Sequence, residues 1–332
     1  MKTTETNDNP NTNFPPVAGF WHRFAAWLID SLLIILAGQA VCLVFKPLLF
    51  QLGPYGRPIG LLFILPYFGL MNSVVFDGQT FGKRLMKIAV RGADNRPISV
   101  LRSLGRVSIL ALPFLLGGWP LPVLENPVAA VTAGLIVFGL GGSILYTMVF
   151  NRKAGQGIHD LICRTYVVQP DGYPADAFPI TPGIHRVISA VWMGLTAFML
   201  AFLMFDNPSY TPKPVTVQVR QLRQTLSVDP RFFTADVRDQ TVTPENNPAY
   251  RGLVVDVWTV GELAEDERWE TAVHITGIVL RDMKDIDEFD QIQVKLSDGY
   301  DIGIASYRSG FWYSNPVDEW QKILSENPEA LE

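Results

Sequence analysis

The chain has 332 residues, of which 48% are hydrophobic and only 18% are charged, and its mean hydropathy is +0.18. This composition is too apolar and too poor in charge for an ordinary soluble domain. The net charge of −5 combines +6 over residues 1–205 with −11 over residues 206–332. The acidic second part argues against nucleic-acid binding, and two cysteines cannot form a disulfide scaffold. The pattern predicts a membrane region followed by an aqueous domain.

The first 18 residues are rich in Asn, Thr and Pro, which favours a disordered tail over 1–18. The tail does not have the form of a secretory signal, since Lys2 is its only basic residue and no apolar run precedes Phe24. We therefore expect the first membrane segment to remain attached.

Five stretches are long and apolar enough to predict membrane-spanning helices. The third contains Pro113, Gly117 and two further prolines, so it could be a kinked span or a broken, re-entrant segment. A re-entrant segment would move everything after it to the other side of the membrane. The stretches are 24–45, 59–76, 107–124, 127–150 and 187–205.

The basic residues of the loops predict the orientation, because short loops rich in Lys and Arg face the cytoplasm. Seven basic residues lie in 77–106 and four in 151–186, whereas the loop at Glu125 and Asn126 has none. Five spans then place the N-terminus in the cytoplasm and residues 206–332 outside. We expect a multi-pass membrane protein.

The remaining chain divides by composition. We predict a membrane domain over 19–170, a cytoplasmic linker over 171–186, the added span 187–205, a Pro-rich linker over 206–214 and an acidic domain over 215–332. The fold class is an all-α polytopic membrane domain of about five helices, followed by a small extracytoplasmic α+β domain.

Short β-branched runs predict strands in the acidic domain, Asp298-Gly299 predicts a hairpin turn, and 316–324 predicts a closing helix. The domain has no CxxC, HExxH or GxSxG motif, and its histidine, His274, is read as a core or surface residue. We expect no enzyme activity and no cofactor. The predicted strands are 215–219, 253–260, 271–280, 291–296 and 302–306.

The first predicted span contains the most informative charged residues. Arg23, Trp27 and Asp30 have the i, i+4, i+7 spacing of one helix face. An ionised Asp within a span needs a partner, a water-filled cavity or a transported cation. The alternative is an Asp at the membrane interface that pairs with a neighbour. We expect Asp30 to face the interior of the bundle and Arg23 to find its partner on another helix.

The segment after the second predicted span, 77–84, reads DGQTFGKR. It differs from a P-loop, which has four residues between its glycines and Ser or Thr after its Lys. The simplest interpretation is a turn made by Gly78 and Gly82, with Lys83, Arg84 and Lys87 at anionic lipid headgroups.

A third cluster follows the fourth predicted span. His159-Asp160 places an imidazole beside a carboxylate, which could relay protons or bind a cation. The alternative is a cytoplasmic turn that caps a short amphipathic or strand segment. His22 and His159 have no recognised metal-ligand spacing, so we expect no metal site. Within the fourth span, Gly139, Ser143 and Thr147 predict a helix-packing face.

These three clusters together resemble the RDD family of bacterial membrane proteins. The matching strings are GFWHRFAAWLID at 19–30, DGQTFGKRLMKIAV at 77–90 and GIHDLICRTYVV at 157–168. The resemblance places the family's arginine and two aspartates at Arg23, Asp30 and Asp160. Its most recognisable turn corresponds to Gly78, Gln79, Thr80, Gly82 and Lys83.

The resemblance implies a bacterial inner-membrane location and transport, with exchange of sodium or potassium for protons reported for some members. Cys163-Arg164, the fifth span and the acidic domain depart from the family pattern. Two functions follow as hypotheses. One is a transporter or cation/proton exchanger in which Asp30 is the carrier and Arg23 sets the pKa of Asp30. In this hypothesis, His159 and Asp160 pass protons at the cytoplasmic mouth. The other is a membrane-anchored scaffold or sensor, in which the acidic domain binds a protein, peptide or cation and the helical bundle anchors it or signals. The expected partners are the lipid bilayer, monovalent cations and protons.

Overall fold

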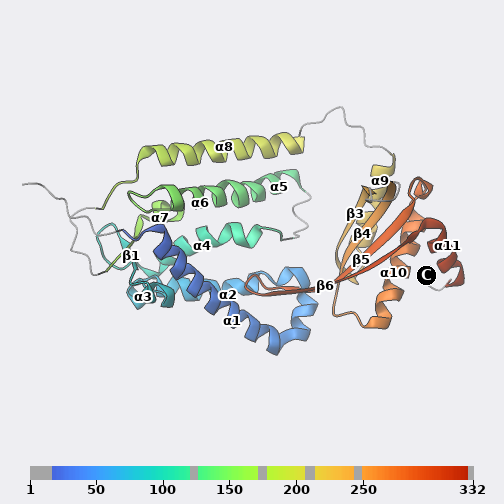
Figure 1. The fold of residues 1–332 in the computed structure, drawn as a ribbon, viewed down its shortest axis with the longest axis horizontal. Coiled ribbons are helices and arrows are strands. Elements are labelled where there is room, and N and C mark those ends of the chain that lie inside the picture. Colours follow the sequence, from blue (N-terminus) through green and yellow to red (C-terminus); the bar gives the residue numbers. More distant parts are fainter. Residues whose placement is uncertain (1–16, 120–125, 171–177, 206–213, 243–248, 328–332) are drawn as a thin grey trace, which may run out of the picture. The chain divides into compact units, whose positions relative to one another are not determined.

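The computed structural model describes residues 17–119, 126–170, 178–205, 214–242 and 249–327 (Figure 1). The chain forms two compact units. Unit 1 comprises Met1–Leu36, Leu61–Gly118 and Val123–Met204, and unit 2 comprises Ala37–Gly60, Trp119–Pro122 and Phe205–Glu332. Most of the tail predicted over 1–18, and most of the linker predicted over 206–214, lie outside the described residues.

Unit 1 is built mainly of helices. The first helix, α1, begins in unit 1 and continues into unit 2, and its backbone is non-helical at Phe45, two residues before Pro47. The elements of this part are α1 (Phe20–Leu52), α2 (Pro58–Met71), η2 (Val74–Phe76), α3 (Phe81–Leu85), β1 (Ala89–Gly92), α4 (Val100–Leu116), α5 (Pro127–Gly134), η4 (Leu135–Leu140), α6 (Gly141–Phe150), α7 (Ile158–Cys163), β2 (Thr165–Val168) and α8 (Gly183–Phe205).

Three helical stretches among the described residues are long and apolar enough to cross a membrane: Phe20–Gly56, Pro127–Phe150 and Gly183–Leu203. They correspond to the first, fourth and fifth predicted spans. The second predicted span is the shorter apolar helix α2, which has 14 residues. The third was wrongly bounded, because α4 begins at Val100 under a Ser99 cap and ends at Leu116. Five spans and the sidedness of the chain stay predictions.

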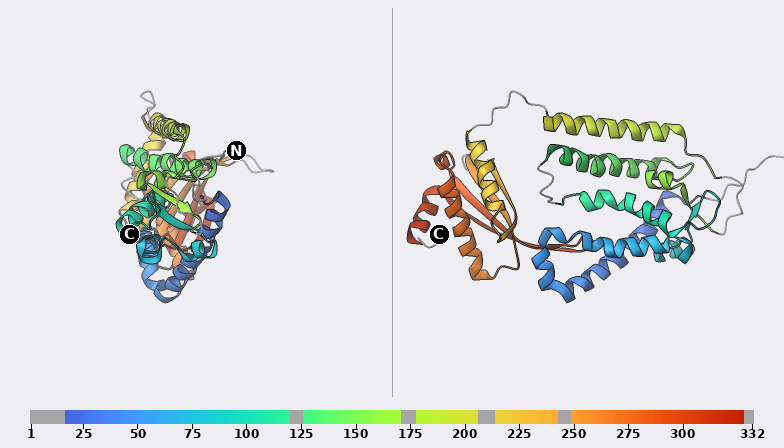
Figure 2. Two further views of the ribbon diagram at one scale, coloured as in Figure 1. Left: turned by 90° about the vertical axis from the view of Figure 1, so that its left-hand side faces the viewer. Right: turned by 180° about the vertical axis from the view of Figure 1, so that it is seen from behind.

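Three helical segments of unit 1 run side by side: α4, the continuous stretch α5–η4–α6, and α8 (Figure 1, Figure 2). The indole Nε1 of Trp192 on α8 donates to the carbonyl oxygen of Phe138 at 3.0 Å. Gly139, Ser143 and Thr147 are buried, as a helix-packing face requires. The described residues of this region therefore form a helical bundle.

A two-stranded sheet joins two sequence segments that carry the predicted motifs. Strands β1 and β2 are antiparallel, with Ala89 opposite Val168 and Gly92 opposite Thr165. Ile88, Val90 and Val167 are buried in a small apolar cluster with Ala26 of α1. This packing brings the segment 77–90 and the segment 157–168 to the N-terminal part of α1.

The C-terminal part of unit 2 contains a four-stranded sheet in the order β3-β4-β5-β6, in which β4 and β5 are parallel and the outer pairs are antiparallel. The helix α10 connects the two parallel strands. The elements are α9 (Pro214–Ser227), β3 (Phe232–Val242), β4 (Tyr250–Thr259), α10 (Glu265–Asp282), η5 (Ile286–Glu288), β5 (Gln291–Asp301), β6 (Ser306–Pro316) and α11 (Val317–Glu326). The predicted α+β character of this domain is therefore present.

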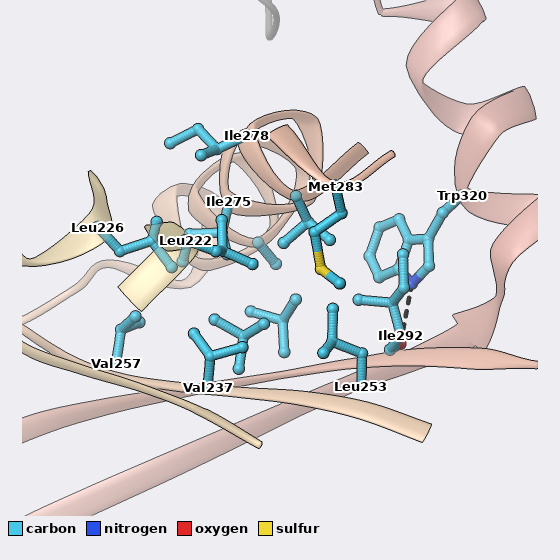
Figure 3. Packing of buried hydrophobic residues seen from close by; sticks show 14 of the residues in the cluster. Leu222, Leu226, Val237, Leu253, Val257, Ile275, Ile278, Met283, Ile292 and Trp320 are labelled. Atoms are coloured by element: carbon cyan, nitrogen blue, oxygen red, sulfur yellow. Dashed lines mark hydrogen bonds between the residues drawn. The ribbon is translucent and has the colours of Figure 1, made fainter. Parts of the chain in front are cut away.

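The core of this domain lies between the sheet and its helices (Figure 3). Leu253 of β4, Ile275 of α10 and Ile292 of β5 are completely buried. Trp320 of α11 is also buried, and its indole Nε1 donates to the carbonyl oxygen of Ile292 at 3.0 Å. A buried indole with a satisfied donor adds apolar area without the cost of an unpaired N–H.

Two predicted strands of this domain are helices instead. Residues 215–219 lie in α9, where Val215, Leu222 and Leu226 recur at helical spacing and are buried. Residues 271–280 lie in α10. Three acidic residues in its first turn favour a helix N-terminus, and the Glu267 carboxylate accepts a hydrogen bond from the Ala264 N–H at 3.0 Å. Capping and burial outweigh the β-branched composition here, and His274 consequently lies on a helix.

The predicted hairpin turn is also displaced. Asp298-Gly299 lies inside β5, and residues 302–305 form the turn, so the predicted strand 302–306 was wrong. Gly299 has φ +135°, and a Cβ there would lie 2.0 Å from the Tyr307 carbonyl oxygen. The glycine is needed for the close approach of β6. The predicted strands at 253–260 and 291–296 and the closing helix are confirmed, each shifted slightly at its ends.

Unit 2 also includes η1 (Gly53–Gly56) and the adjoining ends of α1 and α2. Arg57 Nε lies 2.7 Å from an Asp301 carboxylate oxygen, and the Tyr55 hydroxyl donates to the Phe233 carbonyl oxygen at 3.1 Å. A Cβ at Gly60 would lie 2.4 Å from the Ile302 carbonyl oxygen. Residues 37–60 are therefore an integral part of this unit.

Candidate functional site

The Asp30 carboxylate lies inside unit 1, with 1% of the residue exposed. Its Oδ1 accepts a hydrogen bond from the Tyr67 hydroxyl at 2.7 Å and from the Gly82 backbone N–H at 2.8 Å. Its Oδ2 accepts from the Thr80 hydroxyl at 2.6 Å. The described residues thus give this carboxylate three hydrogen-bond donors, and all three are uncharged. The expected inward orientation of Asp30 is confirmed.

The turn before α3 and the first turn of α3 contact α1. Gly78 has φ +68°, a backbone conformation that L side chains rarely adopt. Thr80 caps α3, since its hydroxyl accepts from the Lys83 N–H at 3.2 Å while donating to Asp30. A Cβ at Gly82 would lie 2.1 Å from the Ala26 carbonyl oxygen. Glycine at this position therefore allows the first turn of α3 to contact the backbone of α1.

Lys83 follows directly after this contact. Its Nζ donates to the Asn72 side-chain oxygen, and Asn72 is 1% exposed. Lys83 itself is partly exposed. Burial of the ammonium, together with the positive charges of Arg106 and Arg23, lowers the pKa of Lys83 to about 7, although Asp30 and Asp160 act in the opposite direction. The interpretation of Lys83 as a lipid-contacting residue gives way to a place within a buried polar network.

The second family aspartate, Asp160 on α7, binds two arginines. Its Oδ2 lies 2.8 Å from Arg23 Nη2, and its Oδ1 lies 2.7 Å from Arg106 Nε. The Thr165 hydroxyl and the Gly157 N–H also donate to it, at 2.9 and 3.2 Å. The carboxylate is fully buried, and Arg23 and Arg106 are 7% and 5% exposed. The two guanidinium groups help to hold the pKa of Asp160 well below its usual range, against the effect of burial.

This geometry identifies the partner of Arg23. Arg23 does not share an ion pair with Asp30, although both are on α1; its partner is Asp160, 137 residues away in sequence. Arg23 also donates to the Gly155 carbonyl oxygen. Trp27, predicted to share the face of these residues, is 45% exposed. Two of the three residues on the predicted face are therefore buried.

His159 is held in its neutral form. Its Nε2 lies 3.3 Å from Arg106 Nη2, and because arginine can only donate, Nε2 accepts and the proton lies on Nδ1. Nδ1 has no hydrogen-bond partner among the described residues. Burial, together with Arg106, Arg23 and Lys83, lowers the pKa of His159 to about 3, although Asp160 opposes this change. A neutral imidazole at physiological pH is poorly suited to carry a proton here.

The remaining residues of the family turn support the backbone. The Gln79 side chain donates to the Ile88 carbonyl oxygen at 3.2 Å, and the Gly78 carbonyl oxygen accepts from the Val90 N–H at 2.8 Å. These bonds connect the turn to β1.

Sequence reasoning missed Arg106, Tyr67 and Asn72 as parts of the site. Arg106 was counted only as a basic loop residue, although it lies at helical spacing from Arg102 and Ser103 on α4. The sequence signal that could have identified Arg106 was its position beside the apolar residues that follow it on the same helix. Tyr67 and Asn72 carried no signal beyond being polar residues near the end of an apolar run.

No group of three or more His, Cys, Asp or Glu side chains that could hold a metal ion occurs in the described part of the chain. The oxygens around Asp30 are of another kind: a carboxylate, the Tyr67 and Thr80 hydroxyls and, near Lys83, the Asn72 amide. Oxygen atoms of this type suit hard cations.

Comparison with known proteins gives one match. Residues 17–164 match the model of the family described as the RDD family, and this range contains every residue of the two buried carboxylate clusters except Thr165. No curated protein and no solved structure matches the chain. The arginine and the two aspartates singled out in the sequence thus lie within one matched stretch, and this match is consistent with an RDD family protein.

Proposed function

We propose that the RDD domain exchanges a monovalent cation for a proton across a membrane, with the Asp30 carboxylate as its cation-binding group. The observation that carries this proposal is the environment of Asp30, which is buried among uncharged donors rather than neutralised by an arginine. A buried, ionised carboxylate without a charged partner is stabilised when a small cation binds to it, and such a cation can also leave again.

The surroundings of Asp30 support this role. Tyr67 on α2 and Thr80 before α3 place two hydroxyl oxygens beside the carboxylate. On cation binding, each hydroxyl can rotate its hydrogen away and offer a lone pair instead. The site could then coordinate a cation without moving a helix.

Asp160 has a different part in this proposal. Its charge is already compensated by Arg23 and Arg106, so it holds α7 against α1 and α4. A carboxylate held by two buried guanidinium groups has little capacity for a further cation. We therefore assign transport to Asp30 and structural positioning to Asp160.

Purified full-length protein in proteoliposomes with an internal pH dye tests the proposal. External Na⁺, K⁺ or Li⁺ should drive proton movement in the wild type, and Asp30→Asn should abolish it. Asp94→Asn is the matched control, because Asp94 is an exposed carboxylate of the same domain. No proton movement with any of the three cations, in protein shown to be folded and inserted, would remove the exchanger proposal.

A second candidate function rests on the acidic C-terminal part of unit 2. A groove of about 1080 Å³ there is lined by four glutamates, by Trp269, and by Arg231 and His274. The domain could bind a basic segment of a protein partner through these glutamates while the helices anchor it. Fluorescence anisotropy of a labelled lysine-rich peptide with the full-length protein tests this function, and an affinity unchanged by Glu270→Gln would exclude it.

A further inference from the structure

A shallow pocket of unit 1 lies where the start of α4 meets the end of α7. These two segments are at the end of the helical bundle that also carries β1 (Figure 1). The pocket has a volume of about 560 Å³, and its lining shares no residue with the groups that contact Asp30 or Asp160. It is lined by Ala93, Asp94, Arg102, Ile162, Cys163 and Arg164.

The pocket lies close to the end of a candidate membrane span. The span Pro127–Phe150 ends at Phe150, whose side chain is exposed. The chain then folds back, since the Asn151 side-chain amide donates to the Gln156 carbonyl oxygen at 3.0 Å and the Gly155 N–H donates to the Asn151 carbonyl oxygen at 2.8 Å. The helix α7 therefore begins beside the end of this span, where lipid headgroups meet a membrane protein.

The Arg102 guanidinium is held in a fixed orientation by backbone carbonyl groups. Its Nε donates to the Cys163 carbonyl oxygen and its Nη2 to the Arg164 carbonyl oxygen, each at 2.5 Å. These bonds leave the Nη1 donors without an acceptor among the described residues. Within the same residues, Arg102 and Arg164 have no carboxylate partner, in contrast to Arg23 and Arg106. Their positive charges are therefore available to an anion.

The charges of the lining match one class of anion. Arg164 ends α7 in the left-handed conformation, with φ +51°, and its side chain is exposed. The Asp94 carboxylate accepts a hydrogen bond from the Arg96 N–H at 3.3 Å, within its own turn. Two arginines and one aspartate leave the lining with a net positive charge of one. This charge complements the single negative charge of a phosphodiester, an anion that arginine binds well.

Exposed apolar side chains flank both arginines. Leu101 precedes Arg102 on α4 and is 80% exposed, and Ile162 lines the pocket and is 61% exposed. A free phosphate gains nothing from these side chains. A phospholipid, by contrast, places its phosphate next to its acyl chains, so it can use the arginines and the apolar side chains together.

We propose that this pocket binds the phosphodiester group of an anionic membrane lipid. The Arg102 Nη1 and the Arg164 guanidinium donate to the phosphate oxygens, and Leu101 and Ile162 contact the acyl chains. Two planar guanidinium groups suit this task better than lysines, because each can donate two parallel hydrogen bonds to phosphate. The bound lipid connects α4 with α7. The site is separate from Asp30, so this inference does not depend on the proposed exchange.

The test counts lipids bound to purified full-length protein in a neutral detergent by native mass spectrometry. Phosphatidylglycerol has one negative charge, whereas the headgroup of phosphatidylcholine has no net charge. With the same acyl chains, phosphatidylglycerol should bind about tenfold more tightly. It should also raise the thermal unfolding temperature more than phosphatidylcholine does, because it binds the folded state more tightly. Equal affinities for the two lipids would overturn the proposal.

Inorganic phosphate distinguishes a lipid site from a site for small anions. Bound phosphatidylglycerol should be retained equally in phosphate and in chloride solutions of the same ionic strength. Displacement by phosphate but not by chloride would identify a site for free phosphate and would overturn the assignment to a lipid.

Arg164→Gln is the decisive variant, because this exposed side chain makes no hydrogen bond to the described residues. Its affinity for phosphatidylglycerol should fall about fivefold, with little change for phosphatidylcholine. Lys153→Gln is the matched control, since it removes an exposed positive charge of the preceding loop outside the pocket. It should bind both lipids like wild type. Unchanged affinity in Arg164→Gln, or an equal loss in Lys153→Gln, would contradict a defined site.

Arg102→Lys tests the fixed guanidinium. The variant keeps the positive charge but loses the paired bonds to the Cys163 and Arg164 carbonyl oxygens, so it should bind phosphatidylglycerol about as weakly as Arg164→Gln. Wild-type affinity in folded Arg102→Lys would show that the orientation of this group is unimportant and would overturn the assigned geometry. If this variant does not fold, the comparison of Arg164→Gln with Lys153→Gln decides.

Discussion

The two buried aspartates of the region that matches the RDD family model are equally inaccessible but are held in opposite ways. Asp160 accepts hydrogen bonds from two guanidinium groups, whereas the donors to Asp30 are two hydroxyls and one backbone N–H. Charged partners fix a carboxylate permanently, because separating them leaves bare charges in a low-dielectric interior. Neutral donors satisfy the hydrogen-bonding capacity of a carboxylate but do not compensate its negative charge. This difference is the basis for assigning a structural role to Asp160 and cation binding to Asp30 in the proposed exchange.

The basic side chains near the two aspartates differ in the same way. Arg106 forms an ion pair with the Asp160 carboxylate. The Lys83 ammonium donates to the Asn72 side-chain oxygen, which is uncharged.

The largest expected effect follows from removing the charge of Asp160. Asp160→Asn leaves Arg23 and Arg106 buried without a carboxylate, and breaking a buried ion pair in this way costs about 3–5 kcal/mol. We expect a strongly lowered thermal unfolding temperature in detergent and poor recovery of folded protein.

Asp94→Asn, at an exposed position, should leave the unfolding temperature unchanged. An Asp160→Asn protein as stable as wild type would show that Asp160 is not the structural carboxylate, and the contrast drawn between the two sites would fail.

The second effect concerns the contact of α3 with α1. Gly82→Ala places a Cβ where the Ala26 carbonyl oxygen lies, so α3 must move away from Asp30. Overpacking of this kind costs about 1–3 kcal/mol. Thermal unfolding should show the loss, and Na⁺ binding should weaken because Thr80 and Lys83 move with the turn.

Gly105→Ala is the matched control, because Gly105 also lies in a helix and nothing lies within 4 Å of its added Cβ. It should be neutral or slightly stabilising, since alanine favours a helix over glycine by about 1 kcal/mol. Equal behaviour of the two variants would contradict a close contact at Gly82.

The sequence predicted which charged residues belong to the candidate site, but it did not predict which of them form ion pairs with each other. Arg23, Asp30 and Asp160 were identified from charge in apolar surroundings and from the family resemblance. Spacing along one helix could not show that Arg23 forms an ion pair with Asp160. This pairing depends on the β1–β2 sheet, which brings distant segments of the chain to α1. Arg106 escaped notice because a basic residue at the end of a loop has a sufficient explanation in membrane topology.

The fold was also predictable only in part: the long apolar helices were predicted, whereas some elements of the acidic domain were not. Long apolar runs predicted α1, the α5–η4–α6 stretch and α8, because length and hydropathy alone determine such helices. In the acidic domain, β-branched residues of α10 were mistaken for a strand, since periodicity over a short apolar run does not distinguish the two. The acidic first turn of α10 was the stronger signal. The strand β3 was missed entirely, because its sequence is polar on one face.

A smaller stability effect is expected at Asp30. Asp30→Asn keeps an oxygen that can accept from Thr80 or Gly82, so its cost should be about 1–2 kcal/mol, well below that of Asp160→Asn. Cation-driven proton movement should nevertheless be lost. Comparing unfolding temperature with exchange for both variants checks the assignment, and a larger stability loss in Asp30→Asn would reverse it.

The smallest effect is a pH dependence from His159. Its folded pKa, about 3, lies below the ordinary value of about 6.5, so between these values the unfolded chain binds a proton that the folded chain does not. Stability is therefore fully present above about pH 6.5 and declines as the pH falls toward 3. Thermal unfolding across this range should show a shallower decline in His159→Gln than in wild type. His22→Gln, at an exposed histidine, should retain the wild-type slope, and an unchanged slope in His159→Gln would mean that His159 is not held neutral beside Arg106.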